Sequence, residues 1–286
     1  MTRSIGGDTA LAGVVGQAAR RSLSPVIHNA WIAAAGLDGA YLPFGLVPGR
    51  FAAFIEGLRG GNVRGVNVTI PFKEEALALA DSAAPFAERA GAANLLLFAA
   101  DGSIGAHNTD GVGLMEALKG AGHVPASGPA VVIGAGGAAR AAVSALLDAG
   151  APEVRIVNRT LERAEALAGQ DGRARAIGWS RLPSAVEDAA AVVNATSLGG
   201  EGQPALDLPP APAAAIVMDM VYRPLETALL RQARERGHPT ADGLAMLIAQ
   251  ARPSFEALFG RPVPEGVDVR ALCEAVLGER AVGASP

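Results

Sequence analysis

The chain of 286 residues is long enough for one large domain or two of ordinary size. Hydrophobic residues make up 50% and the formal net charge is −4, so no electrostatic footprint for nucleic acid or an anionic membrane is present. The single cysteine, Cys273, allows no intrachain disulfide. No apolar run is suited to spanning a bilayer, and no signal-peptide pattern opens the sequence. We therefore expect a soluble, cytoplasmic protein.

The first part of the sequence alternates strand-like runs with Ala- and Leu-rich helical patterns, which is typical of an α/β fold with parallel sheets. Ser24 followed by Pro25 predicts a capped helix start. Asp101-Gly102 predicts the turn of a hairpin within 93–110. Expected strands are 11–17, 39–47 and 63–70, and expected helices are 24–36, 49–61 and one that begins at about Phe72.

A second α/β pattern follows Asp110. From Ala130 the order strand, glycine-rich turn, helix, strand predicts a βαβ unit. Further expectations are a helix at 111–122, strands at 190–196 and 215–222, a surface loop at 202–215 and helices from 242 on. We therefore expect two α/β domains, with the C-terminal helices returning to the first: 1–109 plus 244–286 with a mostly parallel sheet, and 110–243 as a Rossmann-like domain.

The glycine-rich turn lies between an expected strand and an expected helix and matches the pattern G-x-G-x-x-G/A. In that pattern, backbone N–H groups approach a pyrophosphate at the helix N-terminus. The alternative is a tight turn without a ligand, because glycine is abundant, with 36 residues. The turn consists of Gly134, Ala135, Gly136, Gly137 and Ala138, with Ala139 in the third position of the pattern.

The next strand ends at Asn158 and Arg159, where dinucleotide-binding folds place the residue that reads the adenosine ribose. An enzyme for NAD is expected to present Asp or Glu there. This chain presents Arg159, Thr160 and Arg163, whose guanidinium and hydroxyl groups suit a 2′-phosphate. The alternative is a pair of solvent-exposed arginines at a helix start. We expect NADP(H) as the cofactor.

Small polar residues stand at the ends of several apolar segments. In the strand 63–70 the side chains alternate, so Asn67 and Thr69 share the face opposite Val66 and Val68. Each polar residue also has an ordinary explanation as a cap, turn or half-exposed strand residue. Together they predict a pocket for a small polyol. The other members are Ser22, Ser24, Asn94 and Asp110. The histidines and the cysteine show no metal-ligand spacing, so no metal is expected.

Lys73 stands at the start of an expected helix, where the macrodipole places roughly half a positive charge. The dipole disfavours the ammonium form, which favours proton exchange with a carbonyl/alcohol couple. Asp110 is a carboxylate that would hold and orient this amine. The alternative is an exposed lysine whose neighbours Glu74 and Glu75 offset the dipole. A positively charged side chain at the positive end of a helix conflicts with the dipole, and such a conflict indicates a functional residue.

Nine segments, in order and over essentially the whole chain, resemble the shikimate dehydrogenase family. The resemblance implies two α/β domains with the substrate in the cleft between them. It also implies NADPH-dependent reduction of 3-dehydroshikimate to shikimate, in the pathway to chorismate and the aromatic amino acids. The segments are SLSPVIHN, GVNVTIPFKEEA, GAAN, HNTDGVG, VVIGAGGAARA, NRTLERA, NATSLGG, DMVYRPLET and DGLAMLIAQA.

By this resemblance Lys73 is the catalytic acid/base and Asp110 its paired carboxylate. The residues implied to hold the substrate are Ser22, Ser24, Asn67, Thr69, Asn94, Asp110, Tyr222 and Gln250. The positions implied to bind the cofactor are the turn 134–138, the segment 158–163, and Met220 and Gly243 near the nicotinamide. The small-molecule substrate is the expected partner, and the protein is expected to be a monomer or homodimer.

Two positions depart from the family pattern. Leu95 stands where Thr usually follows the pocket asparagine, and Leu23 stands between the two serines. One alternative is a quinate/shikimate or aminoshikimate dehydrogenase, which often uses NAD; the Asn158-Arg159-Thr160 run speaks against it. Another alternative is a non-catalytic NADP-binding sensor. In such a protein we would expect Lys73 or Asp110 to be replaced by another residue.

Overall fold

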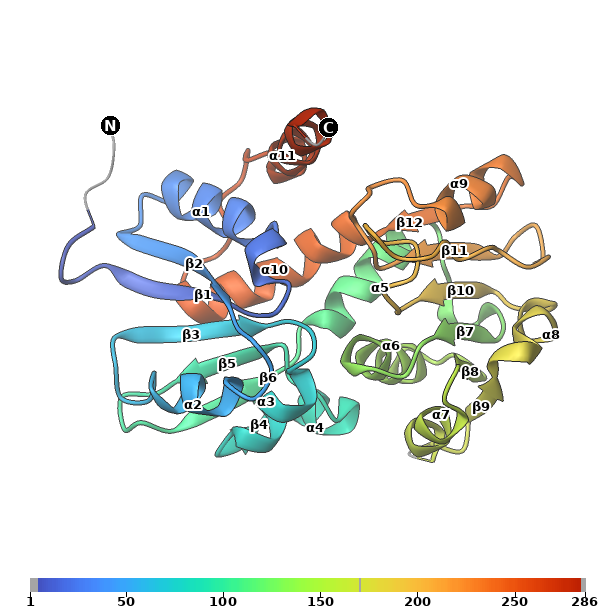
Figure 1. Cartoon of the computed structure of the whole chain (residues 1–286), viewed down its shortest axis with the longest axis horizontal. Coiled ribbons are helices and arrows are strands. Elements are labelled where there is room, and N and C mark those ends of the chain that lie inside the picture. Colours follow the sequence, from blue (N-terminus) through green and yellow to red (C-terminus); the bar gives the residue numbers. More distant parts are fainter. Residues whose placement is uncertain (1–4, 170, 284–286) are drawn as a thin grey trace. The chain divides into compact units, whose positions relative to one another are not determined.

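The computed structural model describes residues 5–169 and 171–283. Contacts divide the chain into two compact units: unit 1 comprises residues 1–109 and 250–286, and unit 2 comprises residues 110–249. Each unit contains one six-stranded sheet (Figure 1). The predicted α/β architecture in two parts is confirmed. Within the described ranges, no helix has the length and apolar character needed to cross a membrane.

The sheet of unit 1 has the strand order β2-β1-β3-β5-β6-β4 (Figure 1). β1 runs parallel to β2 and β3, whereas β5 is antiparallel to β3 and β6. The β5–β6 pair confirms the predicted hairpin. Pro43 is tolerated in β2 because β2 is an edge strand. The strands are β1 (Ala10–Gly16), β2 (Gly39–Gly45), β3 (Val63–Val68), β4 (Ser82–Ala83), β5 (Leu95–Phe98) and β6 (Ile104–His107).

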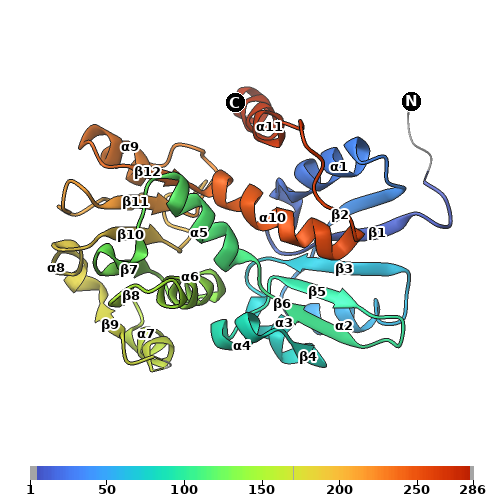
Figure 2. The same ribbon diagram turned by 180° about the vertical axis from the view of Figure 1, so that it is seen from behind.

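Helices cover this sheet with apolar faces. Val66 and Val68 pack with Phe51 and Phe72 in one buried cluster, which confirms the predicted apolar face of β3. The helices are the 3₁₀ turn η1 (Ala19–Arg21), α1 (Ser24–Ala34), α2 (Phe51–Glu56), α3 (Lys73–Leu79), α4 (Pro85–Ala90), α10 (Gly243–Phe259) and α11 (Val269–Gly283). The division between the units falls at Gln250, inside α10, which is one continuous helix (Figure 2).

The prediction that Ser24 caps a helix was wrong. Ser24 is itself the first residue of α1, and Leu23 occupies the cap position without a side-chain hydrogen bond. The Ser22 hydroxyl instead accepts a hydrogen bond from the Ser24 backbone N–H, at 3.1 Å. The hydroxyl of a residue two positions upstream therefore accepts a hydrogen bond from a backbone N–H at the helix start, as in other Ser and Thr turns.

The sheet of unit 2 is parallel throughout and has the order β12-β11-β10-β7-β8-β9. The order reverses between β7 and β10, the switch point of a Rossmann sheet. The predicted βαβ unit is confirmed as β7, α6 and β8. The strands are β7 (Ala130–Ile133), β8 (Val154–Asn158), β9 (Ala174–Gly178), β10 (Ala191–Asn194), β11 (Ile216–Asp219) and β12 (Thr240–Asp242).

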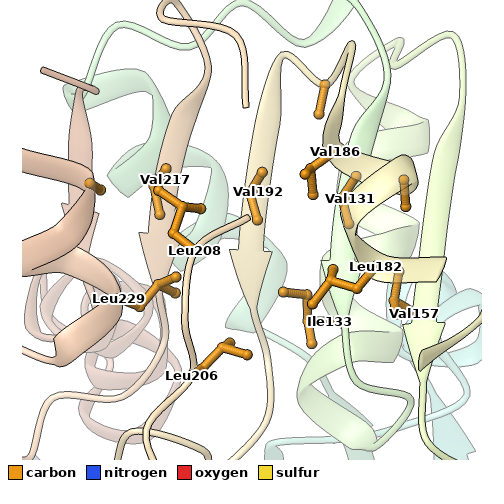
Figure 3. Packing of buried hydrophobic residues seen from close by; sticks show 13 residues of the cluster. Val131, Ile133, Val157, Leu182, Val186, Val192, Leu206, Leu208, Val217 and Leu229 are labelled. Carbon is orange, nitrogen blue, oxygen red and sulfur yellow. The ribbon is translucent and has the colours of Figure 1, made fainter. Parts of the chain in front are cut away.

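In the core of unit 2, valines of the strands pack with leucines from the surrounding segments (Figure 3). Residues 202–215 form no helix or strand, as predicted, but the prediction of a surface loop was wrong for Leu206 and Leu208, which are 4% and 2% exposed. Burial of each contributes about 1.5–3 kcal/mol and anchors the loop. The helices are α5 (Asp110–Gly120), η2 (Pro125–Ser127), α6 (Gly137–Asp148), α7 (Leu161–Ala168), η3 (Trp179–Arg181), α8 (Leu182–Val186) and α9 (Ala228–Glu235).

Candidate active site

A network of buried polar side chains centres on Asn94 in unit 1. The Asn94 amide donates to Thr109 Oγ1 at 2.9 Å and to Gln250 Oε1 at 3.2 Å. Its oxygen accepts from the Thr109 backbone N–H at 2.7 Å. Asn94 directly precedes β5, and Gln250 comes from α10, 156 residues away. Two residues predicted to hold the substrate are thus joined in one cluster.

Asn67 belongs to the same network from the neighbouring strand β3. Its Nδ2 donates to the backbone oxygen of Asn94 at 3.1 Å and to Ser254 Oγ at 3.0 Å. Its Oδ1 accepts from the Tyr41 hydroxyl at 2.8 Å. The predicted alternation of β3 is confirmed, since Val66 and Val68 lie in the apolar core while Asn67 joins a polar cluster.

The two serines form a pair at the start of α1. The Ser22 hydroxyl donates to the Ser24 hydroxyl at 3.1 Å, and Ser24 is buried. Thr69 follows the end of β3, is half-buried, and donates its backbone N–H to Val15 O at 2.9 Å. These three hydroxyl groups come from segments that follow or flank adjacent strands of one sheet.

Three members of the cluster were missed by the sequence analysis: Tyr41, Thr109 and Ser254. Thr109 Oγ1 lies 3.1 Å from both Gln250 Oε1 and Ser254 Oγ. Ser254 follows Gln250 by four residues, so both lie on one face of α10. That spacing was a usable signal. Nothing in the local sequence around Tyr41 indicates its distant partner.

Lys73 is the first residue of α3, and Glu74 and Glu75 fill the rest of the first turn. Its backbone oxygen accepts a hydrogen bond from the N–H of Ala93 at 2.8 Å, one residue before Asn94. Asp110 is the first residue of α5, is 5% exposed, and directly follows Thr109. Lys73 and Lys119 are the only two lysines in the sequence, beside 22 arginines.

In unit 2 the glycine-rich turn connects β7 to α6 at the switch point of the sheet. Gly134 has φ of +118°, and a Cβ there would lie 3.1 Å from Ala195 O and Thr196 Cγ2, so the turn requires glycine. Gly136 occupies the N-cap, and among the described residues no side chain caps this helix. A Cβ at Gly136 would meet no atom within 4 Å. This arrangement fits a pyrophosphate at the helix N-terminus.

The segment after β8 carries the predicted 2′-phosphate residues. Asn158 ends β8 and donates its Nδ2 to the backbone oxygen of Thr160 at 2.8 Å. Thr160 is the N-cap of α7. Arg159, Thr160 and Arg163 are all exposed, at the carboxyl end of a strand next to β7. Two cationic groups and a hydroxyl therefore stand at the start of α7.

Met220 and Gly243 meet at the other side of the switch point. Met220 directly follows β11, and a Cβ on Gly243 would lie 2.3 Å from the Met220 backbone oxygen. Only glycine fits this contact. Tyr222, two residues after Met220, is half-buried. Among the described residues no group of His, Cys, Asp and Glu side chains could hold a metal ion.

Two sequence families match the chain. Residues 14–96 match the shikimate dehydrogenase substrate binding domain, and residues 121–200 match the shikimate / quinate 5-dehydrogenase family. The NADP(+) shikimate dehydrogenase of Caulobacter vibrioides is 53% identical over 284 residues, which cover 98% of this chain and 100% of that protein. The enzyme of the same name from Dinoroseobacter shibae is 47% identical and covers 87% of this chain and 92% of its own length.

Solved structures show the same architecture. Shikimate 5-dehydrogenase from Thermus thermophilus, in complex with NADP(H) and shikimate, has a TM-score of 0.82 and 37% identity, covering 93% of this chain and 99% of that one. Quinate dehydrogenase from Corynebacterium glutamicum, in complex with NAD, also has a TM-score of 0.82, with 28% identity and coverage of 94% and 99%.

Proposed function

Since this chain belongs to the shikimate dehydrogenase family, we propose that it catalyses the reversible NADPH-dependent reduction of 3-dehydroshikimate to shikimate. This reaction is a step in chorismate and aromatic amino acid biosynthesis. The observation that carries the proposal is the buried network of Asn67, Asn94 and Gln250. A set of amide and hydroxyl groups with fixed orientations suits a small substrate with several hydroxyl groups.

The residues proposed to hold the substrate offer complementary hydrogen-bonding groups. Serine and threonine hydroxyls donate and accept, and the Asn and Gln amides do both with separate atoms. The Ser22–Ser24 pair suits the substrate carboxylate, and the amides suit its hydroxyls. The proposed set is Ser22, Ser24, Asn67, Thr69, Asn94, Asp110, Tyr222 and Gln250. We propose that residues 1–109 and 244–286 form the substrate-binding domain and residues 110–243 the cofactor-binding domain.

Lys73 is proposed as the acid/base and Asp110 as its partner. When bound, NADPH supplies the hydride that the C3 carbonyl carbon accepts. The Lys73 ammonium donates a proton to the carbonyl oxygen, which becomes the C3 hydroxyl, and it is left as the neutral amine. Asp110 orients the amine and accepts from a substrate hydroxyl. Both residues are connected to the segment around Asn94, which supports this pairing. The backbone oxygen of Lys73 accepts from the N–H of Ala93, and Asp110 follows Thr109, whose N–H donates to the Asn94 side chain.

The cofactor is proposed to bind along the switch point of unit 2. The uncapped N-terminus of α6 would hold the pyrophosphate. Arg159, Thr160 and Arg163, with Asn158 ordering their turn, would bind the 2′-phosphate. Met220 and Gly243 would lie near the nicotinamide. We further propose a cytoplasmic location and a monomeric or homodimeric state.

The second candidate is a quinate/shikimate dehydrogenase that uses NAD. The similarity to the C. glutamicum quinate dehydrogenase favours it, because that protein shares the fold. The exposed arginines at the start of α7 speak against it, since β8 ends at Asn158 and is followed by Arg159, without a carboxylate at either position. A non-catalytic NADP-binding sensor is disfavoured because Lys73 and Asp110 are both present.

The test is an absorbance assay at the nicotinamide band with purified protein. It compares shikimate with quinate, each with NADP⁺ and with NAD⁺. We expect strong activity with shikimate and NADP⁺ alone. Comparable turnover of quinate, or a preference for NAD⁺, would assign the protein to the second candidate. No turnover with any pair would contradict both candidates.

A further inference from the structure

Tyr41 is a fully buried aromatic residue on β2 whose ring and hydroxyl have different surroundings. The ring is stacked on His28, with centroids 4.1 Å apart and planes 3° apart. The hydroxyl donates to Asn67 Oδ1 at 2.8 Å. Burial raises the pKa of Tyr41 well above its ordinary value, although the Ser24 side chain acts in the opposite direction. The hydroxyl therefore stays a neutral donor at physiological pH.

The oxygen of the Asn67 amide depends on this hydroxyl for its donor. The backbone oxygen of Asn94 can only accept, so the amide nitrogen must face it. The two N–H groups are then used by Asn94 O and Ser254 Oγ, and Oδ1 is buried facing Tyr41. Without the Tyr41 hydroxyl, Oδ1 loses its donor, and a buried acceptor without a donor is costly.

The same hydroxyl reaches the rest of the amide cluster through Asn67. Asn67 donates to the backbone oxygen of Asn94, and the Asn94 amide donates to Gln250 Oε1. Three residues assigned to the substrate are therefore connected to one phenolic oxygen, although Tyr41 was not expected to have any role in the site.

We propose that Tyr41 is a positioning residue for substrate recognition: its hydroxyl anchors the Asn67 amide and thereby holds the Asn67–Asn94–Gln250 cluster in place. The inference rests on the proposed function, because these amides are assigned to the hydroxyls of shikimate. The ring accounts for the packing against His28. The hydroxyl accounts for the anchoring of the amide cluster.

The variant Tyr41→Phe separates these two contributions, since it keeps the stacked ring and removes only the hydroxyl. We expect the KM for shikimate to rise about tenfold, the factor that corresponds to one hydrogen bond between neutral groups. The kcat and the KM for NADP⁺ are expected to stay within about threefold of wild type, because the acid/base and the cofactor turn are untouched. Shikimate-induced stabilisation in thermal unfolding should weaken in parallel.

Thr9→Val is the matched control. Thr9 is 5% exposed, belongs to unit 1, donates from Oγ1 to Asp38 Oδ1 at 2.9 Å and accepts from the Gly6 N–H at 2.9 Å. This variant removes a buried hydroxyl outside the substrate cluster. It should lower the Tm while leaving the KM for shikimate unchanged. A comparable rise of the KM in this control would indicate general loosening of unit 1 and overturn the inference.

The remaining outcomes are distinguishable. Wild-type activity combined with an unchanged KM in Tyr41→Phe overturns this inference alone. Wild-type protein that neither binds nor oxidises shikimate overturns the proposed function, and the inference with it. Should Tyr41→Phe fail to fold, Ser254→Ala removes the acceptor on the opposite side of the Asn67 amide. A raised KM for shikimate in that variant supports the inference, and a wild-type KM overturns it.

Discussion

Asn194 donates an amide hydrogen to Asp219 Oδ1 at 2.9 Å, between register partners on the adjacent strands β10 and β11. Both residues are 0% exposed. The Asn194 oxygen accepts from the backbone N–H and the hydroxyl of Thr196, at 3.0 and 2.7 Å. Asp219 also accepts from Thr227 Oγ1 at 2.7 Å, and burial raises the pKa of this carboxyl. The pair thereby holds the turn after β10 beside Gly134.

Asn194→Asp is expected to lower the free energy of unfolding at pH 7 by at least about 3 kcal/mol, because it sets two buried carboxylates against each other. The deficit should shrink between pH 7 and pH 5, as one of the two carboxyl groups becomes protonated. Urea unfolding at both pH values measures this. Gln232→Glu is the matched control, since the Gln232 amide donates to Asp207 at 2.8 Å on the surface and should cost less than about 1 kcal/mol. Equal losses in both variants would contradict the argument.

Lys73→Ala is expected to lower kcat by at least about 100-fold while the KM for shikimate changes little, because a proton donor acts on the transition state. Steady-state kinetics with shikimate and NADP⁺ measures both constants. Lys119→Ala is the control, since Lys119 is exposed in the last turn of α5 and is the only other lysine. Retention of more than a tenth of the wild-type kcat in Lys73→Ala would rule out the role assigned to this residue.

Arg159→Ala is expected to raise the KM for NADPH about tenfold or more and to leave the KM for NADH nearly unchanged, because only NADPH carries the 2′-phosphate. The effect should weaken at high salt, since Arg159 is exposed. Arg175→Ala, an exposed position on β9, serves as the control for loss of positive charge. Equal changes for both cofactors would remove the support for 2′-phosphate recognition.

His28 makes stability depend on pH. Its ring is fully buried against Trp31, Tyr41 and Phe255, and neither nitrogen has a hydrogen-bond partner among the described residues. Burial lowers the pKa of His28 from 6.5 to about 3. The unfolded chain therefore binds a proton below pH 6.5 that the folded protein does not, and stability falls as the pH drops from 6.5 toward 3.

His28→Phe keeps an aromatic ring in this position and removes the titrating group. Between pH 7 and pH 5 the wild type is expected to lose about 2 kcal/mol more free energy of unfolding than the variant. Urea unfolding at the two pH values gives the difference, in which the other titrating groups cancel. Identical losses in the two proteins would show that His28 is accessible to protons in the folded state.

Local patterns in the sequence were enough to predict much of the fold and part of the candidate site. The period of two in β3 separated Asn67 from Val66 and Val68, and the glycines after β7 predicted the turn into α6. These features depend on neighbouring residues, because strand alternation and a positive φ are properties of a few consecutive positions. The Asp101-Gly102 hairpin belongs to the same kind of prediction.

Other features were decided only by the tertiary structure. Tyr41 and Asn67 are 26 residues apart and Asn67 and Ser254 are 187 apart, so no local pattern brings them together. Leu206 and Leu208 were predicted to lie in a surface loop, but in the structure they are buried in the apolar cluster of unit 2. The sequence by itself determined which residue types were available and which short segments could form. The pairing of their polar atoms depended on long-range packing, because a buried donor or acceptor takes whichever partner the assembled fold places within reach.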